Sequence, residues 1–249
     1  MSKIKRLFFD IETSPNIGMF WSAGYKQKIG YENIIKERSI ICISYKWEGS
    51  LKTYALTWDQ EQDDRAMLEK FIKVANQADE IVAHNGDRFD LPWLRTRCLF
   101  HRIPAFPNYT SVDTLKKARS YFKFNSNRLD YIAKYLGVGG KTSTGFDLWK
   151  EVILKNNKKA LKTMVEYCMN DVVILEEVYN EISKYVPHHV HHGVVNGHDK
   201  LSCPHCASEN THMTKRRVTA TGIVKYQMQC WDCGKYNTVS KKTYEQKQK

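Results

Sequence analysis

The sequence predicts a mixed α/β domain followed by a small cysteine-containing module. Apolar runs of β-forming residues come first and then alternate with helical patterns as far as residue 186, which is typical of a sheet flanked by helices. Two Cys-x2-Cys pairs lie beyond residue 200. A chain of 249 residues with 42% hydrophobic and 27% charged residues is sufficient for one large folded domain and an appendage.

Strands dominate the first part of the large domain. Residues 5–11 (KRLFFDI) form an apolar run that we expect to be a buried strand, and residues 39–46 and 51–58 predict two more strands. Residues 64–77 carry apolar side chains at helical spacing, and residues 80–83 (EIVA) predict a short strand that runs into a polar turn. The chain therefore begins with a β-meander and then alternates between helix and strand.

Three helices complete the large domain. One begins near Asp90, and residues 126–137 predict a second with an apolar stripe and a glycine stop. The longest helical pattern covers residues 157–185 and ends before Pro187. The polar, glycine-containing residues 187–200 then predict a linker.

The net charge is strongly positive and unevenly distributed. The chain has 39 Lys and Arg residues against 27 Asp and Glu, a net charge of +12, and residues 201–249 hold nine of the basic and three of the acidic residues. Such a surface predicts a polyanionic partner, most often nucleic acid, although some basic proteins have none. The sequence shows no run of 18 apolar residues and no signal-peptide pattern, so we expect a cytoplasmic protein without a membrane partner.

Four carboxylates in three places are candidates for chemistry. Asp10 and Glu12 lie at i and i+2 near the end of the first strand, so they face the same side and repel each other unless a cation lies between them. Asp90 opens a helix after a polar turn, and Asp171 shares one helix face with Tyr167 beside an apolar stripe. Each place also has a plain explanation: solvated acids at a strand end, a helix N-cap, and an acid at the edge of a stripe.

Together these residues form three motifs: FDIET at residues 9–13, N-x3-FD at 85–90 and Y-x3-D at 167–171. In this order they resemble the DEDD exonucleases, which are DnaQ-like 3′→5′ exonucleases of the ribonuclease H-like fold. Glu166 stands five residues before Asp171, where the DEDDh branch has His. Tyr167 stands four residues before Asp171, so the third motif resembles that of the DEDDy branch. Further stretches resemble predicted phage and bacterial exonucleases related to family-B polymerase proofreading domains: VDT at 112–114, RLDYIAKYLG at 128–137 and GFDLW at 145–149.

The resemblance implies a ribonuclease H-like mixed sheet and hydrolysis of phosphodiester bonds with two Mg²⁺ or Mn²⁺ ions. Asp10 would bridge both ions, and Glu12 and Asp171 would serve the ion that holds the attacking water. Asp90 would help to hold the other ion, and Tyr167 would orient the water. Oxygen ligands of this kind independently suit such hard cations. Single-stranded DNA is the favoured substrate, and RNA is the alternative because the sequence reveals no contact to a 2′-hydroxyl.

Further residues are expected at the substrate. The resemblance implies three of them: Thr13, Asn85 and Phe89. Where the family often has Gly soon after the first-motif Thr, this sequence has Ser-Pro-Asn at residues 14–16. The unusual stretch that follows carries Phe20 and Trp21, whose rings would stack on or wedge apart terminal bases. Packing of these rings on the domain is the alternative.

Four of the seven cysteines have the spacing of a metal site. The residues are Cys203, Cys206, Cys230 and Cys233. Four thiolates in two C-x2-C pairs predict one tetrahedral Zn²⁺, and the intervening residues alternate like two strands around a Thr-Gly turn. This resembles a zinc ribbon, which is too small to fold without its metal. We therefore place an exonuclease domain at residues 1–186, a zinc ribbon at 201–239 and a basic tail at 240–249.

The ribbon carries its own candidate substrate residues. Lys215, Arg216 and Arg217 occur on the predicted hairpin among aromatic residues, which suits a nucleic-acid strand, while a protein-docking role is the alternative. Five histidines in the linker are interpreted as linker residues because four cysteines complete the zinc site: His188, His189, His191, His192 and His198. The remaining cysteines are expected to be buried small hydrophobes: Cys42, Cys98 and Cys168.

The sequence therefore predicts a metal-dependent 3′→5′ exonuclease with a C-terminal zinc ribbon. A nucleic-acid-binding or docking protein with an inactive nuclease fold is the rival hypothesis. The presence of all four acids and Tyr167 argues against that rival. A ribonuclease of the same fold is a further alternative.

Overall fold

The computed structural model describes residues 4–22, 24, 29–104, 106–140, 145–187 and 190–246. Among these residues the chain divides into two compact units. The large unit comprises residues 5–119 and 124–178, and the small unit comprises residues 179–246 together with residues 4 and 120–123. Within the described ranges, no helix is both long enough and apolar enough to cross a membrane.

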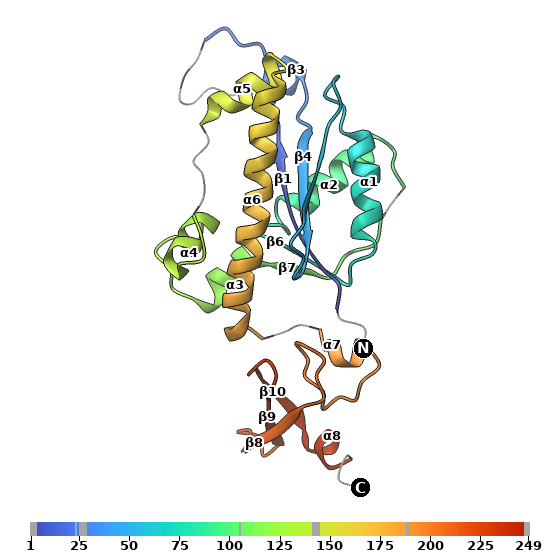
Figure 1. Ribbon diagram of the computed structural model, residues 1–249, viewed down its shortest axis with the longest axis vertical. Helices are drawn as coiled ribbons and strands as arrows, with labels where there is room; N and C mark the ends of the chain where they lie inside the picture. The colour runs from blue at the N-terminus through green and yellow to red at the C-terminus, as the bar shows by residue number, and fades with distance from the viewer. Residues whose placement is uncertain are drawn as a thin grey trace. The chain divides into compact units, whose positions relative to one another are not determined.

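A five-stranded mixed sheet forms the centre of the large unit (Figure 1). In spatial order its strands are β5 (Thr53–Thr57), β4 (Ile40–Trp47), β1 (Arg6–Thr13), β6 (Glu80–Ala83) and β7 (Ser111–Asp113). Strands β1, β4 and β5 form an antiparallel meander, while β6 and β7 continue the sheet parallel to β1. The four predicted strands are present, and β7 was missed because a three-residue strand is too short to show alternation.

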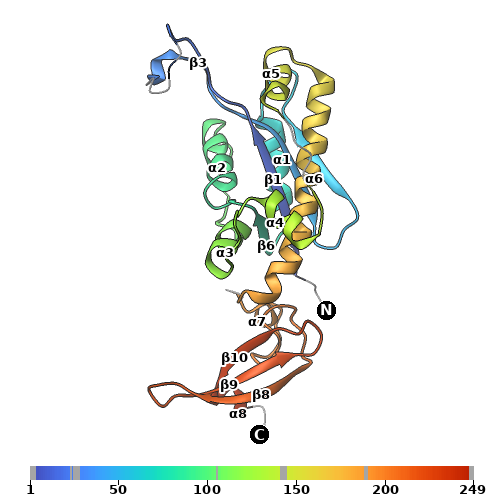
Figure 2. The same ribbon diagram turned by 90° about the vertical axis from the view of Figure 1, so that its left-hand side faces the viewer.

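Helices cover both faces of the sheet. They are α1 (Arg65–Ala75), α2 (Asp90–Phe100), α3 (Thr114–Tyr121), α4 (Leu129–Leu136), α5 (Phe146–Leu154) and α6 (Lys158–Ile182). Buried residues of α1 and α2 pack with Leu7 and Phe9 of β1, whereas those of α5 and α6 pack with Ile41 and Cys42 of β4. Figure 2 shows α2 and α6 on opposite sides of β1. Helices α3 and α5 were not predicted, and α3 buries only Thr114 and Ala118.

Strand β1 extends well past the end of its parallel neighbour. It pairs with β6 only from Arg6 to Phe8, whereas its antiparallel pairing with β4 continues to Thr13. The side of β1 that faces β6 is therefore left open beyond Phe8. This open edge lies at the carboxyl ends of β1 and β6, where α/β folds commonly place their sites.

A short excursion follows β1. Strands β2 (Ile17–Gly18) and β3 (Ile34–Lys36) pair with each other as a separate two-stranded sheet, and a 3₁₀ turn covers Tyr31–Asn33. The two ends of the excursion are joined at its base, where the backbone N–H of Ser14 donates to the carbonyl of Ser39 over 2.9 Å.

The small unit is built around a three-stranded antiparallel sheet. Its elements are a 3₁₀ turn (Ser183–Tyr185), α7 (His192–Val195), β8 (Thr211–Val218), β9 (Val224–Cys230), β10 (Tyr236–Ser240) and α8 (Lys241–Glu245). The strands lie in the order β10-β9-β8. A small core of Leu201, Met228 and Val239, with Tyr226 and Tyr244 against it, supports one face of this sheet.

Residues 190–200 form part of this unit rather than a simple linker. The His192 N–H donates to the carbonyl of Pro204 over 3.1 Å, and His192 is buried. At Gly193 an added Cβ would overlap the hydroxyl of Ser202, so only glycine permits this contact. His191 and His198 are also hydrogen-bonded within the unit, while His188 and His189 lie outside the described residues.

Candidate functional site

Three of the predicted carboxylates converge at the open end of β1. Carboxylate oxygens of Asp10, Glu12 and Asp171 all lie within 4.8 Å of one another. The i and i+2 positions of β1 turn Asp10 and Glu12 toward α6, and α6 brings Asp171, which is 4% exposed. Three like charges this close repel strongly, so the arrangement favours a bound cation.

Asp90 fills the open edge of β1. It begins α2 and is buried, and its carboxylate accepts hydrogen bonds from its own backbone N–H and from that of Ile11 in β1. Burial, followed by the negative charge of Asp10, raises the pKa of Asp90 well above its ordinary value. Its Oδ1 atom is buried and has no hydrogen-bond partner among the described residues. A buried oxygen without a donor, beside other carboxylates, fits a hard divalent cation.

The turn between β6 and α2 sets the position of Asp90. Asn85 adopts a left-handed conformation with φ of 74°, and its N–H donates to Oδ1 of Asp113 over 3.0 Å. A Cβ at Gly86 would come within 2.5 Å of the Cβ of Ala83, so the turn requires glycine here. The Leu91 N–H then donates to the Gly86 carbonyl over 2.9 Å. Asp113, which sequence reasoning did not single out as a site residue, therefore anchors the turn that carries the N-x3-FD motif.

The other predicted residues surround this cluster in different ways. Tyr167 is half-buried and lies one helical turn before Asp171, on the same side of α6. Phe89 is 38% exposed and meets the edge of Trp93, with ring centroids 6.2 Å apart. The Thr13 carbonyl accepts a hydrogen bond from Trp149 Nε1 over 3.0 Å. The GFDLW stretch thus holds the end of β1 in place.

Two aromatic residues of the excursion, Phe20 and Trp21, are largely exposed. Phe20 is 53% exposed and Trp21 is 102% exposed. Both rings are therefore available to a ligand. This exposure disfavours the alternative that the two rings pack on the domain.

A pocket of about 520 Å³ opens onto the acidic cluster. Asp10 and Asp171 line one part of it, and His84, Arg119 and Arg128 line others. The ring of His84 is fixed on both sides, by Thr114 Oγ1 at 2.8 Å and by the Asn127 carbonyl at 3.0 Å. Sequence reasoning missed both arginines. Arg128 starts the RLDYIAKYLG stretch, which was a usable signal, whereas nothing in the pattern marks Arg119.

Cys168 has a role that its apolar surroundings did not predict. It is fully buried on α6, and its thiol donates to the Asp10 backbone carbonyl at 3.5 Å and to Asp10 Oδ2 at 3.6 Å. A hydrogen bond with Cys42, burial and the charge of Asp10 raise the pKa of the Cys168 thiol well above its ordinary value. The thiol therefore stays protonated. It contacts the acidic cluster directly and is more than a small hydrophobe.

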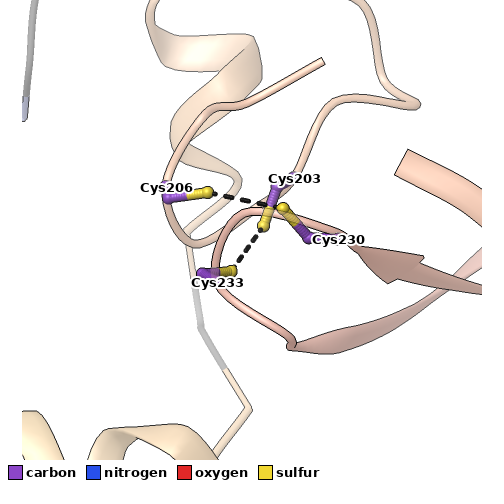
Figure 3. Close-up of side chains that lie close together, drawn as sticks. All are labelled: Cys203, Cys206, Cys230 and Cys233. Atoms are coloured by element: carbon purple, nitrogen blue, oxygen red, sulfur yellow. Dashed lines mark hydrogen bonds between the residues drawn. The ribbon is translucent and has the colours of Figure 1, made fainter. Parts of the chain in front are cut away.

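The four cysteines of the small unit also converge (Figure 3). Their Sγ atoms all lie within 4.8 Å of one another, with 3.6 Å between Cys203 and Cys233 and 3.7 Å between Cys206 and Cys230. These separations match the edge of a tetrahedron with Zn–S bonds of 2.3 Å, about 3.8 Å, and far exceed a disulfide bond. Burial raises the pKa of Cys233 to about 11. At Cys230 burial opposes ionisation, but hydrogen bonds from the backbone of Cys233 and Asp232 and with the side chains of Cys206 and Cys233 lower the pKa.

The basic triplet of β8 is divided between the two faces of the small sheet. Arg216 pairs with Tyr226, which packs against the core, whereas Lys215 pairs with Gln227 and Arg217 with Lys225. Directly opposed residues share a face. Arg216 is therefore on the face opposite to Lys215 and Arg217.

Comparisons with known proteins show similarity to DNA polymerases. The DNA polymerase of Pyrococcus glycovorans is 32% identical over 105 residues, covering 38% of this chain and 12% of that protein. The DNA polymerase of Thermococcus litoralis is 32% identical over 97 residues, covering 38% of this chain and 5% of that protein. This chain thus corresponds to a small part of either relative.

Fold comparison gives a similar picture. The structure of the family B DNA polymerase from the hyperthermophilic archaeon Pyrobaculum calidifontis superposes with a TM-score of 0.56 at 17% identity. The match covers 73% of this chain and 25% of the polymerase. The sequence also matches the RNase H superfamily over residues 7–183, which include all of β1 after Arg6, the helices α2 and α6, and all four acids. With well over half of its length matched, this chain belongs to the RNase H superfamily.

Proposed function

We propose that this chain is a divalent-metal-dependent 3′→5′ exonuclease that degrades nucleic acid, with single-stranded DNA as the favoured substrate. The observation that carries the proposal is the meeting of Asp10, Glu12 and Asp171 within 4.8 Å, with buried Asp90 close enough for Asp10 to raise its pKa. Likeness to DNA polymerases supports action on DNA. The direction of cleavage rests on the resemblance of the three motifs to the DEDDy exonucleases.

The residues of the site would divide the work of hydrolysis. The four carboxylates would hold two Mg²⁺ or Mn²⁺ ions, which, when bound, supply Lewis-acid stabilisation of charge on the attacking and leaving oxygens. The Tyr167 hydroxyl would orient the attacking water through a hydrogen bond. The Cys168 thiol holds Asp10 by donating to Oδ2.

Basic and aromatic groups around the acids would bind the strand. Arg119 and Arg128 line the same pocket as the acids and would attract the phosphates that the carboxylates repel. Exposed Phe20, Trp21 and Phe89 would stack on the terminal bases. Thr13 and Asn85, at the two strand ends that flank Asp90, would contact the terminal nucleotide.

We further propose that the small unit binds one structural Zn²⁺ through its four cysteines. The sulfur separations of 3.6 and 3.7 Å support this assignment. A core of three buried residues is small for an independent fold, so the metal would supply much of the folding free energy.

The proposal is tested by digesting 5′-labelled single-stranded DNA, duplex DNA and RNA with Mg²⁺, with Mn²⁺ and without added metal. A 3′→5′ exonuclease gives a ladder that shortens from the 3′ end, and it leaves circular single-stranded DNA intact. Asp10→Ala is expected to abolish cleavage, while Glu166→Gln, an exposed acid on the same helix, retains it. Cutting of the circle would indicate an endonuclease. Binding without cleavage under every condition would favour the inactive-fold hypothesis.

A further inference from the structure

The strands of the small unit have a one-sided charge composition. Strands β8, β9 and β10 contain no acidic residue, while they carry four basic ones: Lys215, Arg216, Arg217 and Lys225. A structural zinc unit needs no such bias, since a surface on which both signs of charge are interspersed would keep it soluble. The excess of positive charge therefore points to an anionic ligand.

A bulge in β8 determines which of these charges share a face. Met213 pairs with Met228, which is 3% exposed and belongs to the core, so both lie on the covered face. The pairing then shifts between Met213 and Lys215, leaving Thr214 as the extra residue. Its hydroxyl donates to the carbonyl of Gln227 over 3.1 Å. Because side chains alternate along a strand, the bulge shifts this alternation by one residue: Thr211 and Met213 are on the covered face before it, and Arg216 and Val218 after it.

This shift gathers three cations on the uncovered face. Lys215 lies opposite Gln227 and Arg217 opposite Lys225, on the side away from Tyr226 and the core. Arg217 Nε donates to Gln227 Oε1 over 2.7 Å, which fixes the guanidinium along this face. Arg216 falls on the other side.

The same face ends in a prearranged aromatic platform. His212 lies opposite Gln229, and its ring stacks on Trp231 with centroids 4.0 Å apart and planes inclined by 17°. Trp231 remains 65% exposed although one side is occupied. Tyr236, also opposite Gln229 from β10, is 58% exposed. An indole held flat by a second ring loses little entropy when a base stacks on its free side.

We propose that this outer face of the β10-β9-β8 sheet binds single-stranded nucleic acid. Phosphates would lie along Lys215, Arg217 and Lys225, and bases would stack on Trp231 and Tyr236. The three strands offer cations and amides without a carboxylate, and the carboxylate of Asp232, next to Trp231, is hydrogen-bonded to Ser208 and Asn210. Such a surface matches a nucleic-acid strand better than a protein surface, whose mixed charges would place basic groups opposite Arg217 as often as acids. The inference deepens the proposed function and rests on it for the choice of ligand, because the strand would be the nuclease substrate.

The test compares two neighbouring arginines in the full-length protein. Binding of fluorescein-labelled oligo(dT) and oligo(U) of roughly 20 nucleotides, longer than one binding site, is measured by anisotropy at several KCl concentrations. The Asp10→Ala background prevents cleavage. Arg217→Ala should weaken binding at least about fivefold and reduce the slope of log K against log salt by about 0.7, one lost single-strand contact. The matched control Arg216→Ala removes the same charge one residue away, and it should change the affinity less than about twofold.

A stacking variant and a folding control complete the design. Trp231→Ala should weaken binding roughly 5- to 100-fold with an unchanged salt slope, because it removes a stack and no charge. Zinc content and thermal unfolding of each variant show that the small unit remains folded. If Arg216→Ala and Arg217→Ala weaken binding equally, the assignment of the binding site to the outer face is wrong. Unchanged binding in both Arg217→Ala and Trp231→Ala would show that this surface does not bind nucleic acid, and would favour a role in protein docking. Cleavage by the wild type is measured separately. If the wild type binds the strand through this face but does not cut it, the proposed nuclease activity is refuted and the proposed binding face is retained.

Discussion

Replacing Asp171 by Asn should stabilise the metal-free protein while abolishing cleavage. Oxygens of Asp10 and Glu12 lie within 4.8 Å of a carboxylate oxygen of Asp171. Two unit charges 4.8 Å apart repel by about 3.5 kcal/mol at an effective dielectric constant of 20, so two such pairs give about 7 kcal/mol before further screening by water. Asp10 and Glu12 are half-exposed, and water screens them. We therefore expect a net gain of about 2 kcal/mol, or about 4–8 °C in the unfolding midpoint.

The assay is thermal unfolding of the full chain in zinc-containing buffer, first without and then with Mn²⁺. Without Mn²⁺ the variant should melt above the wild type. Mn²⁺ at about one hundred times its dissociation constant should stabilise the wild type by about 2.7 kcal/mol and the variant much less, so that the order of the midpoints reverses. Glu166→Gln removes one negative charge from the same helix outside the cluster, and its midpoint should stay close to that of the wild type.

Two results would refute this reasoning. A metal-free Asp171→Asn protein that melts below the wild type would show that the carboxylates do not repel each other appreciably. Equal stabilisation of both proteins by Mn²⁺ would show that Asp171 is not a ligand.

Four further predictions concern single residues. Tyr167→Phe should lower the single-turnover rate roughly 10- to 1000-fold with substrate affinity retained, and weakened affinity at an unchanged rate would contradict the water-orienting role. Cys168→Ala should reduce Mn²⁺ affinity or activity about tenfold, whereas Cys168→Ser, which keeps a donor toward Asp10 Oδ2, should largely restore it in metal titrations. Although burial raises the pKa of Asp64, the hydrogen bonds from Arg97 lower it, so this carboxylate contributes stability above about pH 4 that is lost as the pH falls through the lowered pKa. Asp64→Asn should therefore cost about 3–5 kcal/mol at pH 7 and flatten the acid limb of the stability curve. Cys203→Ser should abolish zinc binding and the unfolding transition of the small unit while that of the large unit persists, as measured by metal analysis and calorimetry.

Much of the candidate site was predictable because it depends on short-range periodicity. The alternation of a strand places Asp10 and Glu12 on one side, and one helical turn relates Tyr167 to Asp171. The basic wall of the pocket was not predictable in this way. Arg119 comes from α3 and Arg128 from the residue before α4, and only the fold brings them to the acids.

Features that depend on tertiary contacts also could not be predicted from the sequence pattern. Cys168 has the apolar neighbours of a core residue, and only the packing of α6 on β1 brings its thiol to Asp10. Helix α7 is four residues long and contains His and Gly, so intrinsic propensity argued against it. Its contact with Ser202 and Pro204 is a tertiary effect.

The extra residue in β8 has a consequence for how related chains should be compared. Because Thr214 has no partner in β9, a related chain that lacks it would keep Lys215, Arg216 and Arg217 opposite the same residues and on the same faces. A chain of equal length that pairs without the bulge would instead turn Arg216 outward and Lys215 and Arg217 toward the core. Two homologous ribbons with identical basic content can thus differ completely in the surface they offer to a strand. Alignments of this region should therefore be anchored on strand register, with a one-residue gap allowed at Thr214, and not on the count of lysines and arginines.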